Sequence, residues 1–125
     1  MKLFKSHRPD YADGGQLRDF VYVRDAANVA AWLVERPDVS GIFNLGSGHA
    51  RTFSDLAAAV FAAAGRAPQI EYVAMPPTLR DRYQYFTEAK IDRLRAVGYE
   101  GQFTALEAGI GQYVREFLSQ PDPYR

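Results

Sequence analysis

The sequence of 125 residues contains no cysteine and only two histidines. The lack of cysteine excludes a disulfide framework, a thiolate zinc site and a thiol nucleophile. His7 and His49 are far apart in the sequence and have no cysteine to join them, so we expect no metal site. The side chains that remain available for binding or chemistry in this chain are therefore the charged, hydroxyl and aromatic ones.

An excess of charge and a long apolar run are also absent. Fifteen basic side chains balance fifteen acidic ones, which argues against a nucleic-acid-binding surface. The longest apolar run ends at Ala64 and is far shorter than the ~20 residues that span a bilayer. The N-terminal residues become polar too early for a signal peptide. We expect one soluble, cytoplasmic domain that binds neither nucleic acid nor membrane.

Three common catalytic motifs are missing. The sequence has no Gly-x-Ser-x-Gly elbow, and none of its eight tyrosines is followed four residues later by lysine. Residues 44–48 (NLGSG) place two glycines at a predicted turn, but Arg51 stands where a dinucleotide fingerprint has its third glycine. We interpret these glycines as a tight turn. The chain is expected to bind an anionic ligand without transforming it, so no catalytic, cofactor-binding or metal-binding residue is assigned.

Short apolar runs alternate with amphipathic segments, which predicts an α/β fold. The expected strands are residues 19–23, 41–45 and 69–73. The expected helices are residues 26–35 and three segments that begin near Thr52, Thr87 and Thr104. We therefore predict a small three-stranded, partly parallel sheet with about four helices.

Local signals mark the expected helix ends. Asp25 and Thr87 are predicted to cap helices. Thr52 with Asp55, and Thr104 with Glu107, have the spacing of a capping box. Gly98 is expected to end the third helix. Pro121 and Pro123 predict an irregular tail.

Three places are candidates for binding an anion. Arg18, before the first predicted strand, either holds a phosphate through two parallel hydrogen bonds or pairs with a nearby carboxylate. Residues 5–8 (KSHR) are either an anion site or a solvated loop. Residues 79–86 mix arginines with tyrosines, which suits either a nucleotide or the edge of a core.

Two motifs resemble the C-terminal part of the extended short-chain dehydrogenase/reductase family: residues 18–25 (RDFVYVRD) and 41–48 (GIFNLGSG). Residues 3–7 (LFKSH), 79–84 (LRDRYQ) and 94–99 (LRAVGY) are similar to the ADP-L-glycero-D-manno-heptose 6-epimerase family within that superfamily. The resemblance covers essentially the whole chain. The chain departs from some relatives in a longer loop from Arg8 to Gln16.

The resemblance implies that residues 1–125 are a single C-terminal substrate-binding domain and that an N-terminal Rossmann domain is absent from this chain. That domain would carry NADP and the catalytic tyrosine and lysine, so no cofactor is expected on this fragment, which alone would be inactive. The complete enzyme would epimerise ADP-heptose for lipopolysaccharide synthesis, by moving hydride from carbon 6 to NADP and back. The residues that the resemblance assigns to the nucleotide-sugar site are Phe4, Lys5, Ser6, His7, Arg18 and Tyr83.

Two alternatives stay open. In the first, the chain is a fragment of another nucleotide-sugar epimerase or dehydratase that acts on a UDP- or dTDP-sugar. In the second, it is a stand-alone binding module without catalysis. A domain of this type would expose the face that meets its own Rossmann domain. We therefore expect an apolar patch of several hundred Å² or self-association as a homo-oligomer.

Overall fold

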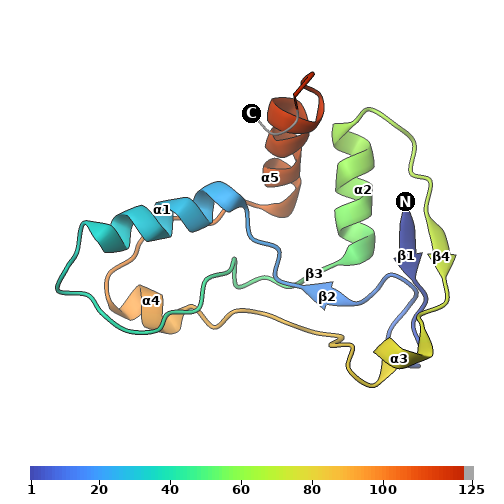
Figure 1. The fold of residues 1–125 in the computed structure, drawn as a ribbon, viewed down its shortest axis with the longest axis horizontal. Coiled ribbons are helices and arrows are strands. Elements are labelled where there is room, and N and C mark those ends of the chain that lie inside the picture. The colour runs from blue at the N-terminus through green and yellow to red at the C-terminus, as the bar shows by residue number, and fades with distance from the viewer. Residues whose placement is uncertain (123–125) are drawn as a thin grey trace.

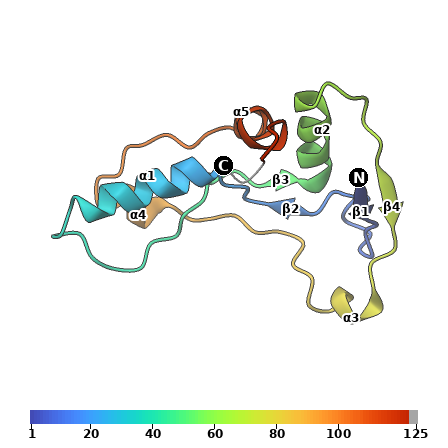
Figure 2. The same ribbon diagram turned by 45° about the horizontal axis from the view of Figure 1, so that its top comes forward.

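The computed structural model describes residues 1–122, and Pro123 of the predicted tail lies outside them. Figures 1 and 2 show an elongated molecule with α1 and α4 at one end and β1 and β4 at the other. The elements in chain order are β1 (Lys2–Phe4), β2 (Leu17–Arg18), α1 (Val23–Val34), β3 (Arg51–Thr52), α2 (Phe53–Ala63), β4 (Glu71–Val73), α3 (Pro77–Arg80), α4 (Asp92–Ala96), α5 (Leu106–Tyr113) and a π-helical segment, η1 (Val114–Leu118).

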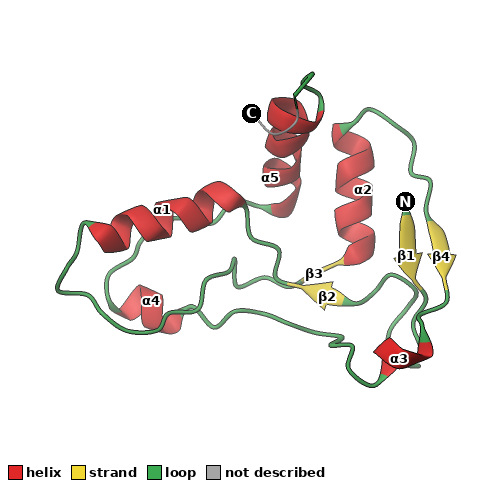
Figure 3. Ribbon diagram, in the orientation of Figure 1, coloured by secondary structure: helices red, strands yellow, loops and turns green. Residues whose placement is uncertain are grey.

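The predicted three-stranded sheet is wrong. The described residues form two separate two-stranded sheets (Figure 3): β1 pairs with β4 in parallel, and β2 pairs with β3 in antiparallel. The strand expected at 69–73 is present as β4. Its partner β1, at Lys2–Phe4, was not predicted, because three residues are too few to show a period.

The other two predicted strands are absent for different reasons. Residues 19–22 are irregular, and α1 begins at Val23, inside the predicted strand. Residues 41–45 have no backbone partner among the described residues, and Ile42 is 83% exposed. A strand exists only where another strand takes up its N–H and C=O groups. The mixed α/β class is correct, but these apolar runs do not form a sheet here.

The first capping box is confirmed. The Thr52 hydroxyl accepts a hydrogen bond from the Asp55 N–H at 2.9 Å, and the Asp55 carboxylate accepts one from the Thr52 N–H at 3.1 Å. Two otherwise unpaired donors at the start of α2 are thereby satisfied. Gly98 also acts as predicted, following the last turn of α4 with a φ of +96°.

The other predicted caps are wrong. Asp25 is in the first turn of α1, and its buried carboxylate accepts hydrogen bonds from the Thr104 N–H at 2.6 Å and the Thr104 hydroxyl at 2.9 Å. Thr104 is thus bound to α1 and does not cap α5, whose N-cap is Ala105. Thr87 caps no helix, since α4 begins at Asp92. Asp25 and Thr104 thus bond to each other and do not cap their own helices.

The buried core lies between α1, α4 and the segment that leads to α5. Val29, Leu94 and Tyr99 form its centre, and the partly buried side chains packed on them are Trp32, Leu33, Phe43, Leu45 and Phe103. Leu94 has no exposed surface. Phe43 and Leu45 belong to a predicted strand, and their apolar character serves this core without any sheet pairing.

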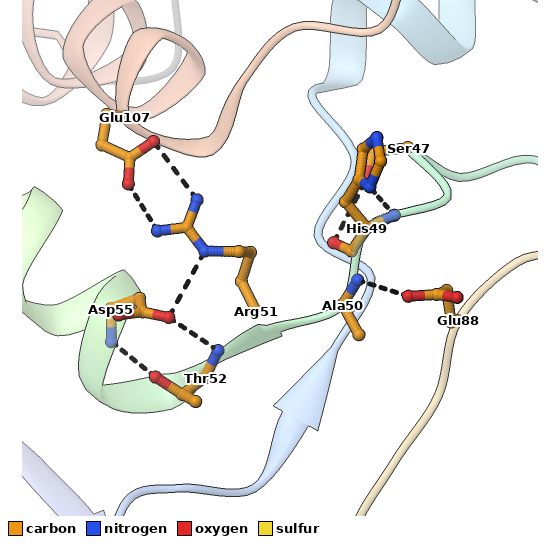
Figure 4. A network of polar contacts seen from close by, with 8 residues as sticks. All are labelled: Ser47, His49, Ala50, Arg51, Thr52, Asp55, Glu88 and Glu107. Atoms are coloured by element: carbon orange, nitrogen blue, oxygen red, sulfur yellow. Dashed lines mark hydrogen bonds and ion pairs between the residues drawn. The ribbon is translucent and has the colours of Figure 1, made fainter.

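Arg51 links α2 to α5 (Figure 4). Its guanidinium lies 3.3 Å from the Asp55 carboxylate and 2.6 Å from the Glu107 carboxylate. Glu107, which was expected in a capping box, is used in this ion pair. The hydrogen bond and positive charge of Arg51 lower the pKa of Glu107 below its ordinary value.

Replacing Thr52 by alanine is expected to lower the free energy of unfolding by about 1 kcal/mol, because the helix N-terminus loses its hydroxyl acceptor. Thr52→Ser keeps that acceptor and is expected to stay close to the wild type. Urea denaturation of the three chains measures the difference. Equal midpoints for Thr52→Ala and the wild type would show that the capping box contributes nothing.

Candidate functional site

Arg18 and Tyr83 lie together. The carbon of the Arg18 guanidinium is 5.2 Å from the centre of the Tyr83 ring and 5.8 Å from that of Phe53. Arg18 ends β2, whereas Tyr83 follows α3, so only the folded chain joins them. The cation thus lies over two aromatic rings, an interaction that arginine makes more often than lysine.

Among residues 1–122, no carboxylate lies within ion-pair distance of Arg18. The Arg18 guanidinium donates a hydrogen bond to the Leu17 carbonyl at 2.7 Å. Of the two interpretations of Arg18 from the sequence, carboxylate pairing is therefore not observed. A half-buried guanidinium with unused N–H donors is suited to a phosphate or diphosphate.

The N-terminal candidates lie around the same tyrosines. The Phe4 ring meets the edge of the Tyr83 ring with centres 6.1 Å apart. Ser6 and His7 contact the Tyr85 hydroxyl, and the Tyr85 ring is 5.8 Å from that of Tyr83. Lys5 continues the β1 pairing through its N–H, which donates to the Val73 carbonyl at 2.8 Å, and its side chain is exposed. The structure thus brings five of the six predicted residues into one connected group, with Lys5 beside it.

Tyr85 is a member of this group that the sequence did not single out. It is 4% exposed, whereas Tyr83 is half-buried. Within the stretch 79–86, Tyr85 thus fills the edge of a core and Tyr83 lies beside a cation, while the use of this stretch for a nucleotide stays a prediction. No signal in the sequence separates the two tyrosines.

Asp19 holds the segment next to Arg18. Its carboxylate accepts hydrogen bonds from the N–H groups of Ser47 at 2.7 Å, Gly48 at 2.9 Å and Ala89 at 3.0 Å, and from the Ser47 hydroxyl at 2.6 Å. Partial burial raises the pKa of Asp19, but the hydrogen bonds from Ser47, Ala89 and Gly48 together outweigh it, so this pKa lies below its usual 3.8.

The glycine turn at 46–48 does not fit a dinucleotide phosphate. The N–H groups of Ser47 and Gly48 are already donated to Asp19. A Cβ on Gly46 would come within 2.5 Å of both Ala89 Cβ and Asp19 Oδ2, so glycine is required by packing. An anionic carboxylate occupies the place where a phosphate would bind. The interpretation of a tight structural turn is thereby supported.

A hollow of about 630 Å³ lies elsewhere, beside Ser47, His49 and Arg51, and none of the six predicted residues lines it. Its arginines are already engaged. Arg51 pairs with two carboxylates, and Arg95 donates to the carbonyls of Tyr99 and Gly101 at 2.7 and 2.8 Å. With its cations satisfied, this hollow is a weaker candidate for an anion than Arg18.

An apolar groove of about 390 Å³ lies between the chain leading into α1, the helix α2 and the helix α5, and Phe20, Leu56, Val60 and Leu118 are among its lining residues. Its location is consistent with the exposed apolar face expected for a separated domain, while self-association stays a prediction. Among residues 1–122 no helix is long and apolar enough to cross a membrane, and no group of three or more His, Asp or Glu side chains is placed to hold a metal ion.

Comparison with known proteins finds similar proteins that share one name. The model of the NAD dependent epimerase/dehydratase family matches residues 3–46. The ADP-L-glycero-D-manno-heptose-6-epimerase of Nitratidesulfovibrio vulgaris strain DP4 is 54% identical over 99% of this chain, which spans 38% of that protein. The enzyme of the same name from Fusobacterium nucleatum is 42% identical over 99% of the chain and 39% of its own length.

Solved structures share the fold. The Helicobacter pylori ADP-L-glycero-D-manno-heptose-6-epimerase has a TM-score of 0.72 at 24% identity, over 96% of this chain and 33% of that one. Thermus thermophilus UDP-glucose 4-epimerase, in complex with NAD, has a TM-score of 0.68 at 27% identity, over 88% of this chain and 33% of that one. Nearly the whole of this chain is thus similar in sequence to a little over one third of an ADP-L-glycero-D-manno-heptose-6-epimerase, and it shares its fold with one third of another protein of that name.

Proposed function

We propose that this chain is the nucleotide-sugar-binding part of an enzyme that converts ADP-D-glycero-D-manno-heptose to ADP-L-glycero-D-manno-heptose. The observation that carries the proposal is the Arg18 guanidinium, which lies 5.2 Å from the centre of the Tyr83 ring and has no carboxylate partner in the described part of the chain. The similarity to ADP-L-glycero-D-manno-heptose-6-epimerases over 99% of the chain supplies the substrate class.

In this proposal Arg18 binds the diphosphate through two parallel N–H···O bonds. Tyr83 and Phe4 form the aromatic side of the site, and Lys5, Ser6 and His7 form its polar rim. Firm binding of the diphosphate leaves the distant end of the sugar free to reorient. Binding energy from a remote group can in this way position the reacting end of a substrate.

The remaining machinery belongs to the rest of the enzyme. The chain spans about 38% of the length of the curated relatives that it matches. We propose that a Rossmann domain in the remainder carries NADP and the acid–base residues, because the turn at 46–48 does not fit a dinucleotide. The C-terminal position of this domain, a homo-oligomeric enzyme, a cytoplasmic location and a role in lipopolysaccharide synthesis stay predictions from the sequence resemblance.

The test uses the complete enzyme. We expect it to convert ADP-D-glycero-D-manno-heptose into its L-glycero epimer, which NMR distinguishes at carbon 6, and to bind ADP more tightly than UDP in calorimetric titration. Tighter binding of UDP or dTDP would favour another nucleotide-sugar enzyme. Negligible binding of every nucleotide and no turnover would contradict the proposal and leave a stand-alone module.

A further inference from the structure

The Tyr85 hydroxyl is the centre of a hydrogen-bonded group to which the proposed function gives no role. It accepts a bond from the His7 N–H at 2.9 Å and lies 2.8 Å from His7 Nδ1. The Ser6 hydroxyl is 3.3 Å away. Because Tyr85 is only 4% exposed, these protein groups take the place of water around its hydroxyl.

The backbone of Tyr85 is bonded to the strand that carries Arg18. The Leu17 N–H donates to the Tyr85 carbonyl at 2.8 Å, and the Thr87 N–H donates to the Leu17 carbonyl at 3.3 Å. The Tyr85 ring also meets the Tyr83 ring at 5.8 Å. Tyr85 therefore contacts Leu17, the neighbour of Arg18, through its main chain and contacts Tyr83 through its ring. It contacts residues 6–7 through its hydroxyl.

Residues 6–7 have few other contacts with the body of the protein. The pairing of β1 with β4 ends at the Lys5 N–H. The Ser6 N–H donates to Asp13 at 2.8 Å, and the Ser6 hydroxyl donates to the Arg8 carbonyl at 2.8 Å, but both partners belong to the same exposed loop. The His7 ring packs on the Tyr85 ring at 5.1 Å. Tyr85 thus provides a direct hydrogen-bonded connection between this turn and the site.

We propose that Tyr85 is a positioning residue of the nucleotide-sugar site. Its hydroxyl holds the Ser6–His7 turn against the Arg18–Tyr83 pair, so that the polar rim of the site is in place before the ligand binds. The inference rests on the proposed function, because it assigns Tyr85 a role in that same site. Preorganisation of this kind lowers the entropy lost on binding.

The main test is Tyr85→Phe in the complete enzyme, since phenylalanine keeps the ring and removes only the hydroxyl. We expect ADP affinity to fall roughly 3- to 10-fold, the range of one ordinary hydrogen bond. KM is expected to rise by a similar factor while kcat stays near the wild-type value, because the turn contributes uniform binding. Tyr72→Phe is the matched control. Its hydroxyl lies 3.5 Å from the Ser54 hydroxyl, outside the site.

A second variant keeps the inference falsifiable if Tyr85→Phe does not fold. His7→Phe keeps a ring and removes the Nδ1 partner, and it is expected to weaken ADP binding to a similar degree. Where both variants fold, the double variant is expected to bind about as tightly as Tyr85→Phe, since the loss of the Tyr85 hydroxyl already removes its contact with His7 Nδ1. The inference would be overturned if the losses of ADP affinity in the two single variants were fully additive in the double variant. It would also be overturned if Tyr85→Phe bound ADP as tightly as the wild type. If Tyr85→Phe is unfolded, a wild-type affinity of His7→Phe would have the same consequence.

Arg18→Ala in the same titration separates the two proposals. If the wild type binds no ADP, or if Arg18→Ala binds as tightly as the wild type, the proposed function fails. If Arg18→Ala weakens binding while Tyr85→Phe and Tyr72→Phe behave alike, only the role of Tyr85 is overturned.

Discussion

Replacing Arg18 by alanine is expected to weaken ADP binding to the complete enzyme by roughly 10- to 1000-fold and to lower kcat/KM by a similar factor. Within residues 1–122, the guanidinium over the Tyr83 ring has no carboxylate that would compete with a ligand. Its loss therefore removes both charge and paired donors from the diphosphate. Calorimetry with ADP and steady-state kinetics with the nucleotide-heptose measure the two quantities.

Two further variants complete the Arg18 experiment. Arg18→Lys keeps the positive charge but loses the planar fork, so its affinity is expected to lie between those of alanine and the wild type. Arg66→Ala removes an exposed arginine from the loop after α2, outside the site, and is expected to behave as the wild type. Wild-type kinetics for Arg18→Ala would remove Arg18 from the site.

Replacing Asp19 by alanine is expected to lower the free energy of unfolding by about 2–4 kcal/mol, because several backbone donors lose their acceptor together. The carboxylate connects β2 to the loop at Ser47–Gly48 and to Ala89, segments that are far apart in the sequence. Denaturant unfolding measures the loss. Asp38→Ala, in an exposed turn, is the control and is expected to change little. Equal stabilities of the two variants would show that Asp19 is not a structural anchor.

The contribution of Asp19 is also expected to depend on pH in one direction. Its pKa is lower in the folded chain than the ordinary value of 3.8, so the folded state favours the ionised form. This stabilisation is fully present above the unfolded pKa, at about pH 4, and is lost as the pH falls through the folded pKa. The difference in unfolding free energy between the wild type and Asp19→Asn is therefore expected to be constant near neutral pH and to shrink in acid. A difference that grows on acidification would contradict this.

Two of the five local signals for helix ends predicted the structure correctly. The Thr52–Asp55 capping box and the stop at Gly98 need only neighbouring atoms and the local backbone, so the sequence contains everything that decides them. Thr104 and Asp25 also have capping chemistry, yet they bond to each other across 79 positions. A side chain that finds a favourable partner far away in the sequence does not cap its own helix. The sequence does not show which distant residues come close enough to act as such partners.

The site was predicted by a different route from the fold. Motif resemblance indicated Arg18, Tyr83 and residues 4–7, and the folded chain brings all but the Lys5 side chain into one connected group. Their roles in binding remain proposals. Tyr85 was missed because two tyrosines separated by one residue have the same chemistry, and only the packing makes one of them buried.

The sequence by itself determined the helix ends set by neighbouring atoms, the lack of the common catalytic motifs, and the residue types available for an anion. The tertiary structure decided which apolar runs become strands, which polar side chains become anchors, and that Arg18 lies over the Tyr83 ring. The physical reason is that strand pairing, burial and charge pairing are properties of two groups in contact. The amino-acid sequence specifies each group but does not show which groups come into contact.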